Sequence, residues 1–259
     1  MFYFESLFLN ENTKVEVLKS TLLKNVNHFF TTRDFVLTAG NLPIYNDLAK
    51  ENRSKLCSHF GIPQNKLFVP IQTHSSNIVV NPKESDFLEN TDAIILSQQN
   101  SATLLNFADC TPIIIHDPIN NIGAVVHAGW RGTAQAIVQK TIAKLIEYFS
   151  VNPSQLVCAI GPTICKKCYC VNEDVYNKIK NTIRQKEQST FEKVTVNDEE
   201  KYLVDLKLVN KIQLNEVGVN KIDISEFCTY CDSDKFFSYR KELGKTARHS
   251  AVLILNGEK

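Results

Sequence analysis

The chain has 259 residues, of which 43% are hydrophobic and 22% are charged, the balance of an ordinary globular protein. Its 29 basic and 28 acidic side chains leave a net charge of +1, so no basic excess favours nucleic acid or an anionic membrane as a partner. The N-terminal residues lack the pattern of a secretory signal, and no apolar run approaches the ~18 residues of a membrane span. The sequence therefore predicts a cytoplasmic protein, whose eight cysteines are free thiols or metal ligands rather than disulfides.

Apolar periodicity predicts alternating strands and helices, and the absence of a repeat or linker favours one domain over residues 1–259. The first 45 residues are typical of short strands and turns, with one strand at 26–33. Further strands are predicted at residues 67–71, 77–80, 93–96, 103–107, 112–116, 123–127, 157–160, 222–224 and 250–255. Helices are predicted at residues 46–60, 134–149, 172–183 and 206–217. In the first of them, the apolar side chains of Leu48, Leu56, Cys57 and Phe60 fall on roughly one face, and Gly61 suits the position after its end. The polar segment 184–201 is expected to be a surface insertion or mobile loop.

Three residues stand where a predicted strand gives way to a loop, namely His74, Cys110 and His127. Such positions commonly carry the reactive groups of a rigid scaffold. Two imidazoles and one thiolate suit Zn²⁺, and three protein ligands with an open fourth position are typical of catalytic zinc. Taken singly, each residue is also compatible with an ordinary buried or surface role, so the spacing alone leaves both interpretations open.

The segment after the third candidate ligand has features of an anion site. A strand leads into His127-Ala-Gly-Trp-Arg-Gly132, and a helix is predicted to follow. The free N–H groups of a helix start, together with the guanidinium of Arg131, are suited to a phosphate or carboxylate. The alternative is that Gly129 and Gly132 only shape a tight turn between strand and helix.

Seven segments of the chain together resemble the signature segments of the YfiH-like family. They are Gln72-Thr-His-Ser75, Ala108-Asp-Cys-Thr-Pro112, His127-Ala-Gly-Trp-Arg-Gly-Thr133, Gly161-Pro-Thr-Ile164, Cys168-Tyr169, Cys228-Thr-Tyr230 and Phe236-Phe-Ser-Tyr-Arg240. The resemblance runs in order from about residue 26 to the C-terminus. It implies a mixed α/β (α+β) fold in which a single domain contains two packed mixed β-sheets flanked by helices. It also implies that His74, Cys110 and His127 hold one zinc ion per chain.

The same resemblance implies a function in purine nucleoside metabolism. Members of the family phosphorolyse adenosine, inosine and S-methyl-5′-thioadenosine to the free base and (methylthio)ribose 1-phosphate, and they also deaminate adenosine. The implied partners are purine nucleosides and phosphate, and the sequence specifies no oligomeric state. Asp109 is a candidate acid/base, or alternatively a hydrogen-bonding residue behind the metal. Arg131 is the leading candidate for holding phosphate. The further phosphate candidates are Arg33, Arg53, Arg240 and Arg248.

The family was formerly described as a multicopper laccase, and the histidine content argues against that chemistry here. Laccases hold several copper ions in sites dominated by imidazole, whereas this chain has six histidines. The four outside the candidate triad show no clustering along the sequence: His28, His59, His116 and His249.

Two alternatives to the zinc enzyme use the cysteines differently. Cys110 could be the nucleophile of a zinc-free hydrolase or transferase with His127 or His74 as its base. The pairs Cys165-x-x-Cys168 and Cys228-x-x-Cys231, with Cys170 nearby, could instead close a structural zinc site in a non-catalytic interaction module. The 59 residues between the two pairs far exceed the ~15–20 of a zinc ribbon. The sequence leaves the second site open.

Overall fold

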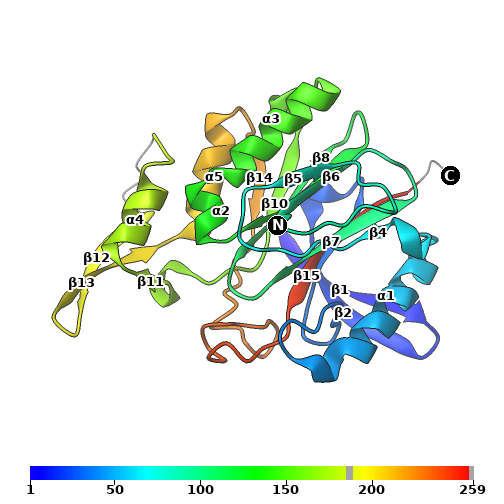
Figure 1. Cartoon of the computed structure of the whole chain (residues 1–259), viewed down its shortest axis with the longest axis horizontal. Helices are drawn as coiled ribbons and strands as arrows, with labels where there is room; N and C mark the ends of the chain where they lie inside the picture. The colour runs from blue at the N-terminus through cyan, green and yellow to red at the C-terminus, as the bar shows by residue number, and fades with distance from the viewer. Residues whose placement is uncertain (185–188, 257–259) are drawn as a thin grey trace.

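Two six-stranded β-sheets form the centre of the computed structural model, which describes residues 1–184 and 189–256 (Figure 1). The first sheet has the order β1 (Phe2–Asn10), β2 (Thr13–Ser20), β3 (Asn27–Thr31), β15 (His249–Leu255), β7 (Ser101–Phe107) and β4 (Leu67–Phe68). The second has the order β14 (Lys221–Ile224), β10 (Val157–Ile160), β8 (Thr111–Asp117), β9 (Ile122–Ala128), β6 (Ala93–Leu96) and β5 (Ile78–Val80). Both sheets are mixed, because β4 runs parallel to β7, β5 to β6 and β10 to β14.

The two sheets pack against each other through an apolar core. Phe30 and Leu253 of the first sheet meet Ile114 and Val125 of the second in one buried cluster. Every residue of β8 and β9 is buried. Strands covered on both faces lose the usual alternation of polar and apolar residues, which is why these strands are continuous apolar runs in the sequence.

Helices cover the outer faces of both sheets. Leu56 of α1 (Asn46–Phe60) packs on the outer face of the first sheet. On the second sheet, Ile142 of α3 (Ile137–Phe149) and Leu214 of α5 (Leu206–Glu216) bury their side chains in another cluster. The order of layers is helix, sheet, sheet, helix, which confirms the mixed α+β fold class predicted from the sequence. None of the helices in the described part of the chain is long and apolar enough to span a membrane.

The helix predicted at 46–60 is confirmed, and it ends as expected. Gly61 follows it with a φ of 67°, the left-handed conformation that glycine adopts without steric cost. Leu56 and Cys57 are buried as the predicted apolar face requires, but Leu48 is 42% exposed. The apolar face is therefore narrower than the periodicity indicated.

The helix predicted at 134–149 is confirmed from Ile137 to Phe149, but its first residues are not continuous with the rest. The segment forms α2 (Trp130–Ala134) and α3, separated by Ala136 with a φ of 55°. Side chains of α5 stabilise the break, since Gln213 Nε2 donates to the carbonyl oxygen of Thr133 at 3.0 Å and Asn210 Nδ2 donates to its hydroxyl at 3.1 Å. The Thr133 carbonyl also accepts from the Ala136 N–H at 3.0 Å, so the tertiary contact adds a second hydrogen bond at the point where the helix is interrupted.

The segment 184–201, expected to be a surface insertion or mobile loop, contains most of a β-hairpin. β12 (Phe191–Val196) and β13 (Glu199–Val204) pair across Asn197 and Asp198, both with positive φ, and β11 (Cys170–Val171) completes a third sheet. Short polar residues tolerate this conformation in tight hairpin turns. The hairpin and α4 (Glu173–Lys180) project from the side of the molecule (Figure 1). Residues 185–188 of the predicted segment lie outside the described residues. The helix predicted at 172–183 has Asn172 as its N-cap, as expected, but ends at Lys180.

Candidate metal centre

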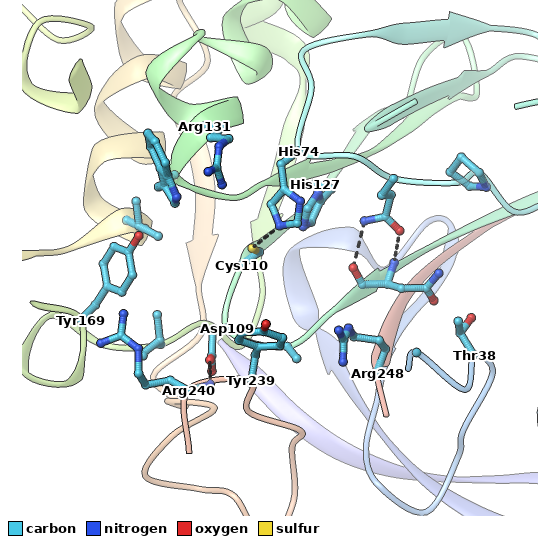
Figure 2. A pocket seen from close by; sticks show the side chains of 18 of the residues that line it. Thr38, His74, Asp109, Cys110, His127, Arg131, Tyr169, Tyr239, Arg240 and Arg248 are labelled. Carbon is cyan, nitrogen blue, oxygen red and sulfur yellow. Dashed lines mark hydrogen bonds between the residues drawn. The ribbon is translucent and has the colours of Figure 1, made fainter. Parts of the chain in front are cut away.

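The three candidate ligands come from separate parts of the chain and meet at one point (Figure 2). His74 lies between β4 and β5, Cys110 directly precedes β8, and His127 lies in β9. Antiparallel pairing of β8 with β9 brings the last two together, with Pro112 opposite His127. One ligand atom from each residue lies within 4.8 Å of the others, and Cys110 Sγ is 3.7 Å from His74 Nε2. This triad can therefore hold a metal ion.

A buried carboxylate, Asp92, orients the triad from behind. Its Oδ1 lies 2.7 Å from His127 Nδ1, and the residue is fully buried. Burial by itself would raise the pKa of Asp92, but the hydrogen bonds from His127 and Ser75 lower that pKa to about 2. A ligating histidine commonly donates its other ring N–H to a carboxylate in this way, which presents the remaining nitrogen to the metal.

The same carboxylate also holds the loop that carries His74. The backbone N–H groups of Thr73, His74 and Ser75 donate to Asp92 at 3.2, 3.1 and 2.7 Å. His74 has a φ of 62°, an uncommon conformation for a residue with a side chain. The sequence reasoning did not identify Asp92. An acidic residue directly before a buried strand was the available signal, because a buried carboxylate requires partners.

Close packing against Cys110 and His74 requires a glycine at position 129. A Cβ atom at this position would lie 2.8 Å from Cys110 Sγ and 2.9 Å from His74 Cδ2. Those distances are shorter than van der Waals contact, so a larger residue would displace two of the three ligands. The glycine therefore has a function beyond shaping the turn that leads from β9 into α2.

The triad is electrostatically coupled. Burial would raise the pKa of the Cys110 thiol, but the neighbouring imidazoles of His127 and His74 lower it to about 6. Burial would lower the pKa of His127, but the Cys110 and Asp92 side chains raise it to about 9. At neutral pH the thiol is therefore ionised, the form in which cysteine binds metals and attacks electrophiles.

The triad opens into a cavity of about 770 Å³. That volume is in the range that accommodates a small organic ligand. Aromatic residues contribute to its walls through Trp130, Tyr169 and Tyr239. Figure 2 shows Tyr169 on one side of the triad and Thr38 on the other, so the ligand space extends in both directions from the candidate metal position.

Three of the five arginines singled out in the sequence line this cavity. Arg131 lies over the Trp130 ring at 4.4 Å, and Arg240 lies over the Tyr169 ring at 5.5 Å. Arg248 Nη1 donates to the carbonyl oxygens of Thr246 and Ala247.

The other two arginines are not among the residues that line the cavity. Arg33 forms an ion pair with Glu242 and donates from Nε to the Ser233 carbonyl at 2.7 Å. Arg53 donates to the Leu37 carbonyl at 2.8 Å, and its burial lowers the pKa of its guanidinium. The contacts of both stabilise the segments around the first sheet.

Asp109 lines the cavity beside Cys110, with both carboxylate oxygens engaged. Thr229 Oγ1 donates to Asp109 Oδ1 at 2.6 Å, and the backbone N–H of Arg240 donates to Oδ2 at 2.7 Å. The residue has a φ of 84°, so its backbone turns sharply just before β8. Asp109 thereby connects the triad to the segment that follows β14.

Within residues 1–184 and 189–256, one other group of side chains could hold a metal ion. It comprises Cys165, Cys168, Cys228 and Cys231, and none of the four lines the cavity. The remaining histidines, His28, His59, His116 and His249, belong to neither group. The histidine-rich clusters typical of multicopper sites are thus not found among these described residues.

Comparison with known proteins places this chain in a defined family. Residues 45–256 match the family described as multi-copper polyphenol oxidoreductase laccase. A purine nucleoside phosphorylase of Haemophilus influenzae is 30% identical over 239 residues, which cover 89% of this chain and 94% of that protein. Another protein of that name from Bacteroides thetaiotaomicron is 28% identical and covers 90% of this chain and 92% of its own length.

Solved structures share the fold over nearly the whole chain. The crystal structure of Bacillus licheniformis hypothetical protein YfiH has a TM-score of 0.83 at 28% identity and covers 93% of this chain and 96% of that one. YlmD from Geobacillus stearothermophilus has a TM-score of 0.84 at 25% identity, with 98% of this chain and 100% of that chain covered. Both agree with the mixed α+β architecture described above.

Proposed function

This chain belongs to the YfiH-like family, and from that membership and the geometry of the triad we propose that it is a zinc-dependent purine nucleoside phosphorylase. The proposed substrates are adenosine, inosine and S-methyl-5′-thioadenosine, which phosphate cleaves to the free base and ribose 1-phosphate or its methylthio analogue. The same site would deaminate adenosine with water to inosine and ammonia. One observation carries the proposal: a metal-binding triad opens into a cavity lined by arginine and aromatic side chains.

Zinc is the metal that best fits the donors of the triad. Two imidazole nitrogens and one thiolate sulfur are typical zinc ligands, and three of them leave a position for water or substrate on the cavity side. The carboxylate of Asp92 supports the fit because it fixes the orientation of His127. When bound, zinc supplies Lewis-acid chemistry, which lowers the pKa of water toward ~7 and thereby suits deamination.

Phosphate would be held by arginines of the cavity wall. Arg131 and Arg240 each lie over an aromatic ring, which limits the orientations of their guanidinium groups. Guanidinium groups bind phosphate through paired, charge-assisted hydrogen bonds. We assign the phosphate to the side of the triad that carries Arg131 and Arg240, and Figure 2 shows both there with Tyr169. A phosphate held in this position would be oriented toward the ribose carbon that it attacks.

The nucleoside would occupy the remaining space beside the triad. Tyr239 and Ile71 offer apolar surface there for a purine ring, and Arg248 is held in place by its bonds to backbone carbonyls. Aromatic and aliphatic walls with a few fixed polar groups are typical of small-molecule sites. The purine is therefore proposed to lie toward Arg248, opposite the phosphate.

Asp109 is better suited to positioning than to free proton transfer. Both of its carboxylate oxygens already accept hydrogen bonds, from Thr229 and from Arg240. Those bonds hold the Arg240 backbone against the segment that carries Cys110. A role in acid/base chemistry would require Asp109 to exchange one of these partners for the substrate.

The test is product analysis of the zinc-replete protein incubated with adenosine in the presence and absence of phosphate. We expect adenine and hypoxanthine, whose sum equals the ribose 1-phosphate formed, only when phosphate is present, and inosine when phosphate is absent. Absence of both bases in the presence of phosphate would contradict the phosphorylase, and absence of inosine in the incubation without phosphate would remove the deaminase from the proposal. The Cys110→Ser variant serves as the control, since it lacks one proposed ligand of the metal.

A second candidate function is a zinc-free cysteine enzyme with Cys110 as the nucleophile. The observation that favours it is the lowered pKa of Cys110, about 6, beside His127 with its pKa raised to about 9. A thiolate paired with an imidazolium is the resting state of many cysteine enzymes. Metal content separates the two candidates, because this one requires no zinc at the triad.

A further inference from the structure

The four cysteines outside the cavity converge from two segments that are far apart in the sequence. Cys165 directly precedes the short helical turn η5 (Lys166–Cys168), Cys168 is the last residue of that turn, and Cys228 and Cys231 follow β14. All four Sγ atoms lie within 4.8 Å of one another, and those of Cys168 and Cys231 are 3.5 Å apart. We propose that this group, the cysteine tetrad, is a second and structural zinc site. The proposal stands on the tetrad alone and is independent of the function of the triad.

Parallel strand pairing explains how two distant pairs meet. β10 and β14 run side by side in the same direction, with Ile160 opposite Ile224. Cys165 follows Ile160 by five residues and Cys228 follows Ile224 by four, so both chains reach the same place after leaving the sheet. The 59-residue interval, which is too long for a zinc ribbon, contains α4, the β12–β13 hairpin and α5. The fold therefore brings the two cysteine pairs together, whereas in a zinc ribbon the pairs are close because few residues separate them.

The spacing of the sulfur atoms fits one mononuclear ion. A tetrahedral zinc with Zn–S bonds of ~2.3 Å places its sulfurs ~3.8 Å apart. The tetrad, with all four sulfurs within 4.8 Å of one another, is close to that size. An iron–sulfur cluster would insert several iron and sulfide atoms between the thiolates and would need them farther apart. Four sulfurs also leave no open position, which is the pattern of structural rather than catalytic zinc.

Backbone N–H groups are directed at the sulfur of Cys228. The N–H of Cys165 donates to Cys228 Sγ at 3.2 Å, and the N–H of Cys231 donates to the same atom at 3.5 Å. Each pair of cysteines thus contributes one amide to a sulfur of the second pair. Hydrogen bonds of this kind stabilise a thiolate, the form that binds a metal.

A buried lysine provides charge compensation. Four thiolates around Zn²⁺ carry a net charge of −2, which requires nearby positive charge when partly buried. Lys207 is 8% exposed, and its Nζ donates to the carbonyl oxygens of Ser225 at 2.6 Å and Phe227 at 3.1 Å, directly before Cys228. This ammonium also interacts with the Asp205 carboxylate, and its position next to Cys228 suits a negatively charged metal site.

The tetrad connects the segments that build one wall of the cavity. Tyr169 directly follows Cys168, and Thr229 directly follows Cys228 and donates to Asp109 beside Cys110. A metal ion bound to all four sulfurs would fasten the segment 161–170 to the segment 226–241. We therefore assign the tetrad the role of holding this wall in place.

Elemental analysis of protein purified under anaerobic, reducing conditions and saturated with zinc tests the site. We expect two zinc equivalents per chain in the wild-type protein. Cys231→Ser, at the exposed end of the tetrad, should lose one equivalent, and Cys110→Ser should lose the other. Cys170→Ser is the matched control, because Cys170 is close in sequence but outside the tetrad, and it should keep both equivalents. A zinc content that Cys231→Ser does not lower below that of the wild type, or iron in place of zinc at the tetrad, would overturn the proposal.

X-ray absorption at the zinc edge provides a measurement that needs no change in the tetrad. In the Cys110→Ser protein, the remaining zinc should be surrounded by about four sulfurs, the shell of a tetrathiolate site. A shell made mainly of nitrogen and oxygen would contradict the tetrathiolate site.

Hydrogen exchange tests the role of the site. Backbone amides in 161–170 and 226–241 should exchange faster in Cys231→Ser than in the wild type, while exchange in β9 stays unchanged. Unchanged exchange in both segments would refute the fastening role.

Discussion

The triad and the tetrad use the same thiolate chemistry in two different settings. The triad combines one sulfur with two imidazoles and borders a cavity of about 770 Å³. The tetrad has four sulfurs, and its members lie outside that cavity. An ion in the first setting retains a position for a substrate or water, whereas an ion in the second is fully coordinated by protein. Ligand number and access to a cavity, rather than the presence of cysteine, distinguish a proposed reactive site from a proposed structural one.

The residues that support the ligands also differ between the triad and the tetrad. Asp92 orients His127 and the loop around His74, so the triad is positioned by a buried carboxylate. At the tetrad the supporting groups are backbone amides and Lys207, which stabilise negative charge. Precise orientation is needed where chemistry occurs, and charge balance is sufficient where the ion only connects two segments.

The largest effect is expected for Cys110→Ser. Serine stays protonated near neutral pH and binds zinc poorly, so the triad should lose its metal and activity should fall by roughly 10³-fold or more. The tetrad should keep its zinc, and the fold should survive because the core does not depend on the triad. Metal content and turnover measured on the same sample check this. An inactive variant with full zinc would instead favour Cys110 as a nucleophile.

Asp92→Asn is expected to have the next largest effect. The amide removes the charge that accepts from His127 and from three backbone N–H groups, and loss of such a partner lowers metal affinity or activity by about 10–100-fold. The measurement is a zinc competition titration with a chromogenic chelator. Asp117→Asn is the matched control, since Asp117 is equally buried but accepts from the turn at Ile119 and Asn120. Equal loss in both variants would indicate general destabilisation.

Arg131→Ala should separate the two proposed reactions. The loss of a charged hydrogen bond to phosphate, ~1.5–3 kcal/mol, corresponds to a rise of about 10–100-fold in the KM for phosphate. Deamination of adenosine uses water and should change less. Arg53→Ala is the control, because Arg53 is not part of the cavity wall. Parallel loss of both activities would mean that Arg131 only positions the loop at the triad.

The smallest effect is expected for Gly129→Ala, which crowds the triad without removing a ligand. The added Cβ would contact Cys110 Sγ and His74, and overpacking of this kind costs ~1–3 kcal/mol, so zinc affinity at the triad should fall roughly tenfold. The control is Gly132→Ala, where the nearest contacts are at 3.3 Å. Unchanged zinc affinity in Gly129→Ala would show that the triad still binds zinc when the added Cβ displaces its side chains.

Local sequence patterns determined much of the scaffold and the identity of the triad. The helix Asn46–Phe60 and its terminating Gly61 follow from periodicity and from the conformational freedom of glycine, which act over a few residues. The buried strands β8 and β9 were predictable as apolar runs, because strands covered on both faces lack the alternation of polar and apolar residues. The candidate ligands His74, Cys110 and His127 follow from the family segments that contain them and from the predicted strand end at each residue.

Only the tertiary structure decided the features that depend on contacts between distant residues. The helix break at Ala136 is stabilised by Gln213, and the role of Asp92 depends on the strand that brings His127 beside it. The two cysteine pairs meet because β10 and β14 are parallel neighbours, a pairing that no spacing along the chain encodes. Hydrogen bonds and metal-binding geometry require atoms to lie within a few ångströms, and such distances between remote segments arise only when the whole chain has folded.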